Sequence, residues 1–172
     1  MTDHTTPRTR LRRDTSQARP HRTDRPSGPR VTLDVGDARH DVDLASLSTV
    51  ERECSVVCAS GERTTGIWTG VEVTRLLDVA DPPPSTTHLR IGSDDGYRAC
   101  VDLTDALSAL VAVARDGRRL GAAEAYDTRF VGARIDGERS VKGVSAVEAL
   151  SLSPGEDPTE YETLSLDDSA YG

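Results

Sequence analysis

Cys58 stands at the end of an apolar run and at the start of a loop of small residues, in the stretch VVCASGERTTG (56–66). A thiolate is a good ligand for a soft metal centre, and the guanidinium of Arg63, five residues on, would favour the ionised thiol. The alternative is a small thiol that only fills the core. Cys54, on the same side of the expected strand, fits that alternative, and so does Cys100. The three cysteines match neither a disulfide set nor a zinc pattern.

A second group of candidate residues lies in YDTRFVGARIDGERSVKGV (126–144), where basic side chains gather around glycines and a serine. Backbone amides of a glycine-containing turn, a hydroxyl group and cations together form a cradle for a phosphate. Lys142 is the only lysine in 172 residues, and its slim ammonium group suits a phosphate pocket better than the broad arginine fork. The alternative is a hairpin with a solvated charged face. The cradle residues would be Arg129, Arg134, Arg139, Ser140 and Lys142.

Tyr97 follows the turn residues SDDG (93–96), so its hydroxyl group could face a cleft. The alternative is an aromatic ring packed at the start of a strand with its hydroxyl group in water. The sequence contains no zinc-protease, P-loop, dinucleotide-binding or nucleophile-elbow motif. The four histidines are scattered along the chain, two of them in its first 30 residues.

Taken together, these segments resemble the molybdenum-cofactor-binding domain of the sulfite oxidase family over residues 31–150. The family has a Cys-Ala-Gly-Asn-Arg-Arg stretch, a Trp-x-Gly-Val segment before paired leucines, a Tyr-Gly-Ala-Ser-Ile-Pro-Leu strand, a Pro-x-Arg-x-Val segment and a Gly-x-Arg-x-Val-Lys segment. The counterparts here, in the same order, are CASGER (58–63), WTGV (68–71) with LL (76–77), YRACVDL (97–103), TRFV (128–131) and GERSVK (137–142).

The resemblance implies a role for each matched residue. Cys58 would be the protein's thiolate ligand to molybdenum. Arg63 corresponds to an arginine that lines the substrate anion site, and Tyr97 to a tyrosine near the metal. Arg129 would help to seat the pyranopterin of the cofactor, and its phosphate end would be held by Arg139, Ser140 and Lys142.

The same resemblance implies a molybdopterin-dependent oxidoreductase that transfers an oxygen atom and two electrons on a small substrate. No haem, flavin or cluster motif is visible, so a separate protein would donate or accept the electrons. Two departures favour an alternative, a domain that binds molybdopterin or a partner without turnover. The family's N-terminal cofactor clamp has no counterpart before Val31, and the acidic Glu62 stands in the cysteine loop beside Arg63.

Charge divides the chain into three parts. Residues 1–30 carry eight Arg and three Asp and lack apolar periodicity, which predicts a disordered basic arm. Residues 31–152 would form one molybdopterin-binding domain, and residues 153–172 a loose acidic tail. The acidic, lysine-poor body argues against specific nucleic-acid binding and favours solubility in high salt. The arm could instead tether the protein to an acidic surface. No apolar run is long enough to span a membrane, so we expect a cytoplasmic protein.

The sequence pattern of the segments that must position these residues predicts an α+β fold with mixed sheets and short helices. Strands are expected at VTLDV (31–35), CSVVCA (54–59), HLRIGS (88–93), YRACVDL (97–103) and TRFVGARI (128–135), and a strand end with a short helix at DVDLASL (41–47). Helical spacing appears in GVEVTRLLDVA (70–80), which DPPP must stop. The strongest helix pattern is LTDALSALVAVARDG (103–117), with Thr104 as its cap and Gly117 at its end. VKGVSAVEALSL (141–152) would be a strand or helix at the domain edge.

Overall fold

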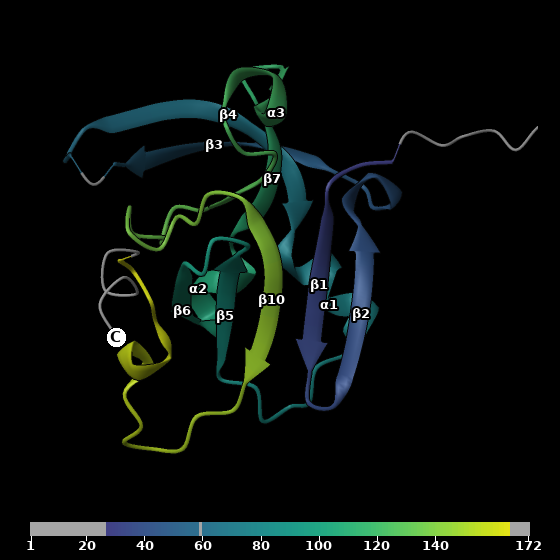
Figure 1. The fold of residues 1–172 in the computed structure, drawn as a ribbon, viewed down its shortest axis with the longest axis vertical. Helices are drawn as coiled ribbons and strands as arrows, with labels where there is room; N and C mark the ends of the chain where they lie inside the picture. The colour runs from purple at the N-terminus through teal and green to yellow at the C-terminus, as the bar shows by residue number, and fades with distance from the viewer. Residues whose placement is uncertain (1–26, 59, 166–172) are drawn as a thin grey trace, which may run out of the picture.

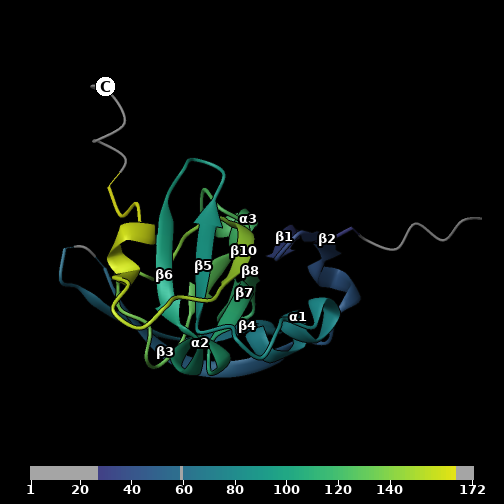
Figure 2. The same ribbon diagram turned by 90° about the horizontal axis from the view of Figure 1, so that it is seen from below.

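The computed structural model describes residues 27–58 and 60–165, which form two β-sheets and a few short helices (Figures 1 and 2). In the first sheet the strand order is β2-β1-β10-β5-β6. β1 and β10 run parallel, and the other neighbours are antiparallel. The strands are β1 (Arg30–Val35), β2 (Ala38–Asp43), β5 (His88–Ser93), β6 (Arg98–Asp102) and β10 (Val144–Leu150).

The second sheet is antiparallel and is built around β7. β4 pairs with one edge of β7, and β8 and β9 pair with the other. β3 lies outside β4. The strands are β3 (Val50–Val57), β4 (Arg63–Glu72), β7 (Leu110–Arg115), β8 (Arg118–Arg119) and β9 (Arg129–Val131). The helices are α1 (Val73–Ala80), α2 (Leu103–Leu107), α3 (Leu120–Ala123) and the 3-10 turns η1 (Leu44–Ser46) and η2 (Pro158–Tyr161).

The main core lies where the two sheets and α1 meet. Alternating residues of β1 (Val31 and Leu33) and of β5 (Leu89 and Ile91) are almost fully buried there, as the period-two pattern of a strand requires. Phe130 of β9 joins the same core. A second cluster fills the inner face of the β3–β4 hairpin, with the members Cys54, Val56, Trp68, Leu110, Ala112, Leu120 and Val131. This architecture confirms the α+β class.

The expected helix over residues 103–117 is wrong beyond Leu107. α2 ends there, and Leu110–Arg115 is the strand β7. β7 is buried on both faces, with Val111 in the main core and Leu110 in the second cluster. A strand buried on both faces is a continuous apolar run, which periodicity alone does not separate from a buried helix. Gly117, with φ +77°, sits in the turn between β7 and β8.

Other expectations also differ from the structure. Asp102 rather than Thr104 caps α2, because its carboxylate accepts a hydrogen bond of 2.8 Å from the backbone N–H of Thr104. β10 is not at the domain edge but lies between β1 and β5. The segment from Ser153 is not loose as far as Ser165, because it contains η2 and a two-residue pairing between Thr163 and Arg98 of β6.

The strand expectations over residues 31–35, 88–93 and 97–103 agree with β1, β5 and β6 within a residue. The strand expected over 54–59 forms as β3 (Val50–Val57), and of the strand expected over 128–135 only β9 (Arg129–Val131) forms. The helix expected over 70–80 begins at Val73, because β4 continues to Glu72. Most of the predicted basic arm (residues 1–26), Ala59 and the end of the acidic tail (166–172) lie outside the described residues. Within the described ranges, none of the helices has both the length and the apolarity needed to cross a lipid bilayer.

Candidate molybdopterin site

Cys58 lies directly after β3, in a tight turn that leads into β4. Its backbone N–H donates to the carbonyl of Glu62 over 2.8 Å, and its carbonyl accepts from the N–H of Gly61 over 2.8 Å. Gly61 has φ +81°, a conformation that glycine adopts without strain. The thiol-bearing residue is half-buried and is not part of a disulfide. The glycine loop thus holds Cys58 at the end of a rigid strand.

The segment 137–142 packs directly against the end of β3. A Cβ atom on Gly137 would lie only 1.8 Å from the carbonyl oxygen of Val57, so there is no room for a side chain. Val57 precedes Cys58, and in the β3–β4 register it is paired with Arg63. The fold therefore brings the strand ends that carry Cys58 and Arg63 against Gly137, the first residue of the segment 137–142.

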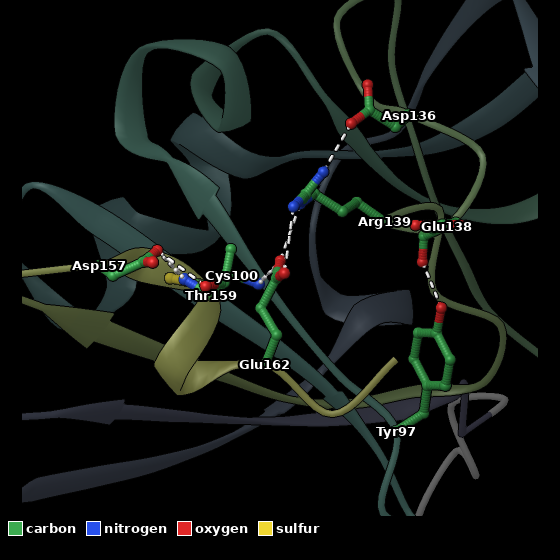
Figure 3. A network of polar contacts seen from close by, with 8 residues as sticks. All are labelled: Tyr97, Cys100, Asp136, Glu138, Arg139, Asp157, Thr159 and Glu162. Atoms are coloured by element: carbon green, nitrogen blue, oxygen red, sulfur yellow. Dashed lines mark hydrogen bonds and ion pairs between the residues drawn. The ribbon is translucent and has the colours of Figure 1, made fainter. Parts of the chain in front are cut away.

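Tyr97 joins this group from the β5–β6 turn. Its hydroxyl group donates to the carbonyl oxygen of Glu138 over 2.5 Å (Figure 3). Burial, and then the negative charges of Glu138 and Glu162, raise the pKa of Tyr97 above its ordinary value, against a smaller lowering by Arg139. The phenol therefore stays protonated at neutral pH and acts as a hydrogen-bond donor to the segment 137–142.

Arg129 is a buried cation in β9, with only 6% of its surface exposed. Its Nε donates to Ser140 Oγ and its Nη1 to the hydroxyl of Tyr126, each over 3.2 Å. Its guanidinium carbon lies 5.7 Å from the ring centre of Trp68 and 6.0 Å from that of Tyr126. No carboxylate in the described part of the chain forms an ion pair with it.

A buried charge without a counter-ion is costly, and the two aromatic faces offset only part of that cost. The hydroxyl proton of Ser140 is already used, because Oγ donates it to the carbonyl of Phe130 over 2.7 Å. The serine therefore orients Arg129 and has no hydroxyl proton left for a ligand. An anionic ligand at Arg129 would supply the missing negative charge.

Lys142 is the neighbour of Arg129 across an antiparallel bridge. It is exposed, and its Nζ lies 5.8 Å from the ring centre of Tyr126. Tyr126 is therefore flanked by both cations, an arrangement that sequence reasoning missed although Tyr126 lies only three residues before Arg129. A hollow of about 620 Å³ opens beside Tyr126 and Lys142, and Asp94, Asp95 and Asp127 also line it, whereas the buried Arg129 does not.

Arg139 differs from the other predicted cradle residues because carboxylates surround its guanidinium group. Its Nε and Nη2 bond to the two oxygens of Glu162 over 2.7 and 3.0 Å, and its Nη1 bonds to Asp136 over 2.6 Å (Figure 3). The charge of Arg139 is thus neutralised within the chain. Arg134 forms a surface ion pair of 3.3 Å with Asp105. Nothing in the sequence pointed to Glu162, which lies in the segment expected to be loose.

Comparison with known proteins shows the family of the chain. The model of the oxidoreductase molybdopterin binding domain matches residues 39–156. The chain belongs to this family. Among solved structures, it resembles the sulfane dehydrogenase SoxCD from Paracoccus pantotrophus, with a TM-score of 0.65 and 15% identity. The similarity covers 72% of this chain and 38% of that one. No protein of curated function matches. The expected resemblance and fold, of the sulfite oxidase type, are confirmed.

The residues present fit the two ends of a molybdopterin. Neither Arg129 nor Lys142 forms an ion pair with a carboxylate of the described residues, so both offer positive charge, which suits the phosphate end. Cys58 offers a half-buried sulfur, which suits a soft metal. The contact between Val57 and Gly137 connects these two ends through one short backbone segment. Cys54 and Cys100 are buried in the core, as expected for cysteines without a ligand role.

Proposed function

We propose that this domain binds a molybdenum–molybdopterin cofactor and acts with it as an oxidoreductase on a small substrate. The observation that carries the proposal is the buried Arg129, which has no counter-ion among residues 27–58 and 60–165 and lies beside Lys142 in a chain of the molybdopterin-binding family. When bound, the cofactor would supply two-electron redox chemistry with oxygen-atom transfer. A separate protein would exchange the electrons.

Each predicted residue takes a role that follows from its surroundings. Cys58 would ligate molybdenum through its thiolate. Lys142 and Arg129 would bind the phosphate end, with Ser140 holding Arg129 in place. Tyr97 would keep the segment 137–142 in position through its bond to Glu138. The exposed Arg63, paired in register with Val57, would attract an anionic substrate towards the metal end.

A second candidate function is binding of the cofactor without turnover. Two features favour it: Glu62 places a negative charge beside Arg63, and the hollow at Lys142 is also lined by the carboxylates of Asp94, Asp95 and Asp127. The charge of Glu62 would weaken attraction of an anionic substrate at Arg63, and the three aspartates would weaken attraction of a phosphate at Lys142. Neither removes Cys58 or Arg129, so both candidate functions predict a bound cofactor and differ only in catalysis.

The test is to purify the full chain from a molybdenum-replete native host and to measure metal and pterin. We expect about one molybdenum per chain together with the fluorescence of an oxidised pterin. A folded, natively purified protein without either would refute cofactor binding. Loaded protein would then be assayed with small sulfur and nitrogen oxyanions and an artificial electron carrier. Bound molybdenum without turnover of any of them would favour the non-catalytic alternative.

A further inference from the structure

The segment 157–163, called the strap below, is folded against β6 although it lies beyond the part of the chain that the family model matches (39–156). Figures 1 and 2 both place its yellow helical turn, η2, beside β6. Asp157 caps this turn, because its carboxylate accepts hydrogen bonds from the N–H and the hydroxyl of Thr159, over 2.9 and 2.8 Å. The hydroxyl of Tyr161 donates to Glu156 over 2.9 Å. The strap thus has a defined structure that its own hydrogen bonds stabilise.

Two sets of backbone contacts anchor the strap to the first sheet. Thr163 and Arg98 exchange backbone hydrogen bonds of 2.9 and 2.8 Å. The N–H of Cys100 donates to Glu162 over 2.9 Å. Because β6 is at the edge of its sheet, these contacts satisfy backbone groups that would otherwise lack a partner strand.

Glu162 also connects the strap to the candidate site. Its side chain is only 5% exposed, and it holds Arg139 through two parallel bonds, while Arg139 is 28% exposed (Figure 3). A bidentate pair of this kind fixes the orientation of both side chains. Arg139 in turn stands between Glu138, whose carbonyl accepts the bond from Tyr97, and Ser140, which orients Arg129.

We propose that Glu162 is a positioning residue for the cofactor site. By holding Arg139, the strap keeps the segment 138–142 in the arrangement that places Arg129 and Lys142 for an anion. Arg139 therefore serves the strap and does not itself bind the phosphate. Docking of the strap then strengthens binding of the cofactor, and binding of the cofactor strengthens docking of the strap to the same extent. This inference rests on the proposed function, but its structural half can be tested without any cofactor.

The experiment compares Glu162→Gln with Glu160→Gln in the full chain. Glu160 is the matched control, because it lies in the same strap, two residues away, and is exposed. Amide hydrogen exchange is measured at two amides between the strap and β6: Cys100, whose N–H bonds to Glu162, and Thr163, whose N–H bonds to Arg98. These two are called the strap amides. It is also measured at Phe130 and Gly143, whose N–H groups bond to Val141 and Thr128. We expect at least tenfold faster exchange at all four amides in Glu162→Gln and no change in Glu160→Gln.

The second measurement is molybdenum content after gel filtration of natively purified protein. Glu162→Gln should retain cofactor roughly tenfold less well than wild type. Arg139→Gln should behave alike, and the double variant should be no worse than either single one, since both changes break the same contact. Additive losses would mean that Arg139 binds the cofactor independently, which would overturn its assignment to the strap.

The inference is also overturned if the strap amides exchange faster while Phe130, Gly143 and cofactor retention stay as in wild type, or if Glu162→Gln leaves the strap amides unchanged. Should Glu162→Gln fail to fold, Glu162→Asp shortens the side chain but keeps its charge, and the same outcomes apply. Wild-type protein without molybdenum would refute the proposed function alone, because the exchange comparison does not depend on a bound cofactor.

Discussion

Gly137→Ala tests the contact that places Cys58 beside the cofactor segment. The added Cβ would lie 1.8 Å from the carbonyl oxygen of Val57, whereas real Cβ contacts are essentially never under 3.0 Å. The two segments must therefore separate by more than about 1 Å. The backbone of Gly137 is not in the left-handed region, so the substitution tests the contact and not backbone strain.

The expected cost follows from that separation. Overpacking of a well-filled contact typically destabilises a protein by roughly 1–3 kcal/mol. Val57 directly precedes Cys58, so the thiol moves relative to Arg129 and Lys142. A misplacement of about 1 Å in a catalytic arrangement can lower activity by roughly a hundredfold. We therefore expect a moderate loss of stability with a much larger loss of cofactor retention and activity.

The assay combines urea denaturation, the rate at which Cys58 reacts with a thiol reagent, and molybdenum content. Gly121→Ala is the control, because its added Cβ would meet the carboxylate of Asp127 at 2.0 Å, and that exposed side chain can rotate away. If Gly137→Ala matched Gly121→Ala in unfolding midpoint, thiol reactivity and molybdenum content, the proposed role of the Val57–Gly137 contact would be refuted.

Three further predictions concern single side chains. Cys58→Ser should lose molybdenum and keep cooperative unfolding, whereas Cys54→Ser should retain molybdenum and lose stability, because it buries a hydroxyl group. Full metal content in Cys58→Ser would disprove the ligand assignment. Lys142→Ala should weaken cofactor retention by roughly ten- to a hundredfold, since a charge-assisted hydrogen bond is worth about 1.5–3 kcal/mol. Lys142→Arg keeps the positive charge and should recover part of the lost retention. Equal cofactor occupancy of wild type and Lys142→Ala after gel filtration would contradict this prediction. Burial, and then the charge of Glu162, raise the pKa of the Cys100 thiol from 9.0 to about 11. The unfolded chain loses this proton first, so the free energy of unfolding should fall as pH rises through that interval. An identical alkaline decline in Cys100→Ala would argue against this origin.

Local patterns were sufficient where the local environment decides the structure. β1 and β5 alternate buried and outward residues, and Gly96, with φ +99°, lies in the turn that SDDG indicated. The pattern failed at Leu110–Arg115, because a helix and a strand buried on both faces require the same apolar run. Residues 110–115 form a strand and not a helix because β4 and β9 supply backbone hydrogen bonds on either side of β7.

The sequence by itself determined which chemical groups are available and in what order: the thiol of Cys58, the phenol of Tyr97 and the cations around Lys142. Their types and order also determined the family. Only the tertiary structure decided how each group is used. Arg129 and Arg139 look alike in sequence. Arg129 is nevertheless buried and forms no ion pair within the part of the chain that the structure describes, whereas Arg139 is neutralised by Glu162. The physical reason is that the charge state of a site depends on burial and on partners distant along the chain, and neither is encoded in the local spacing of residues.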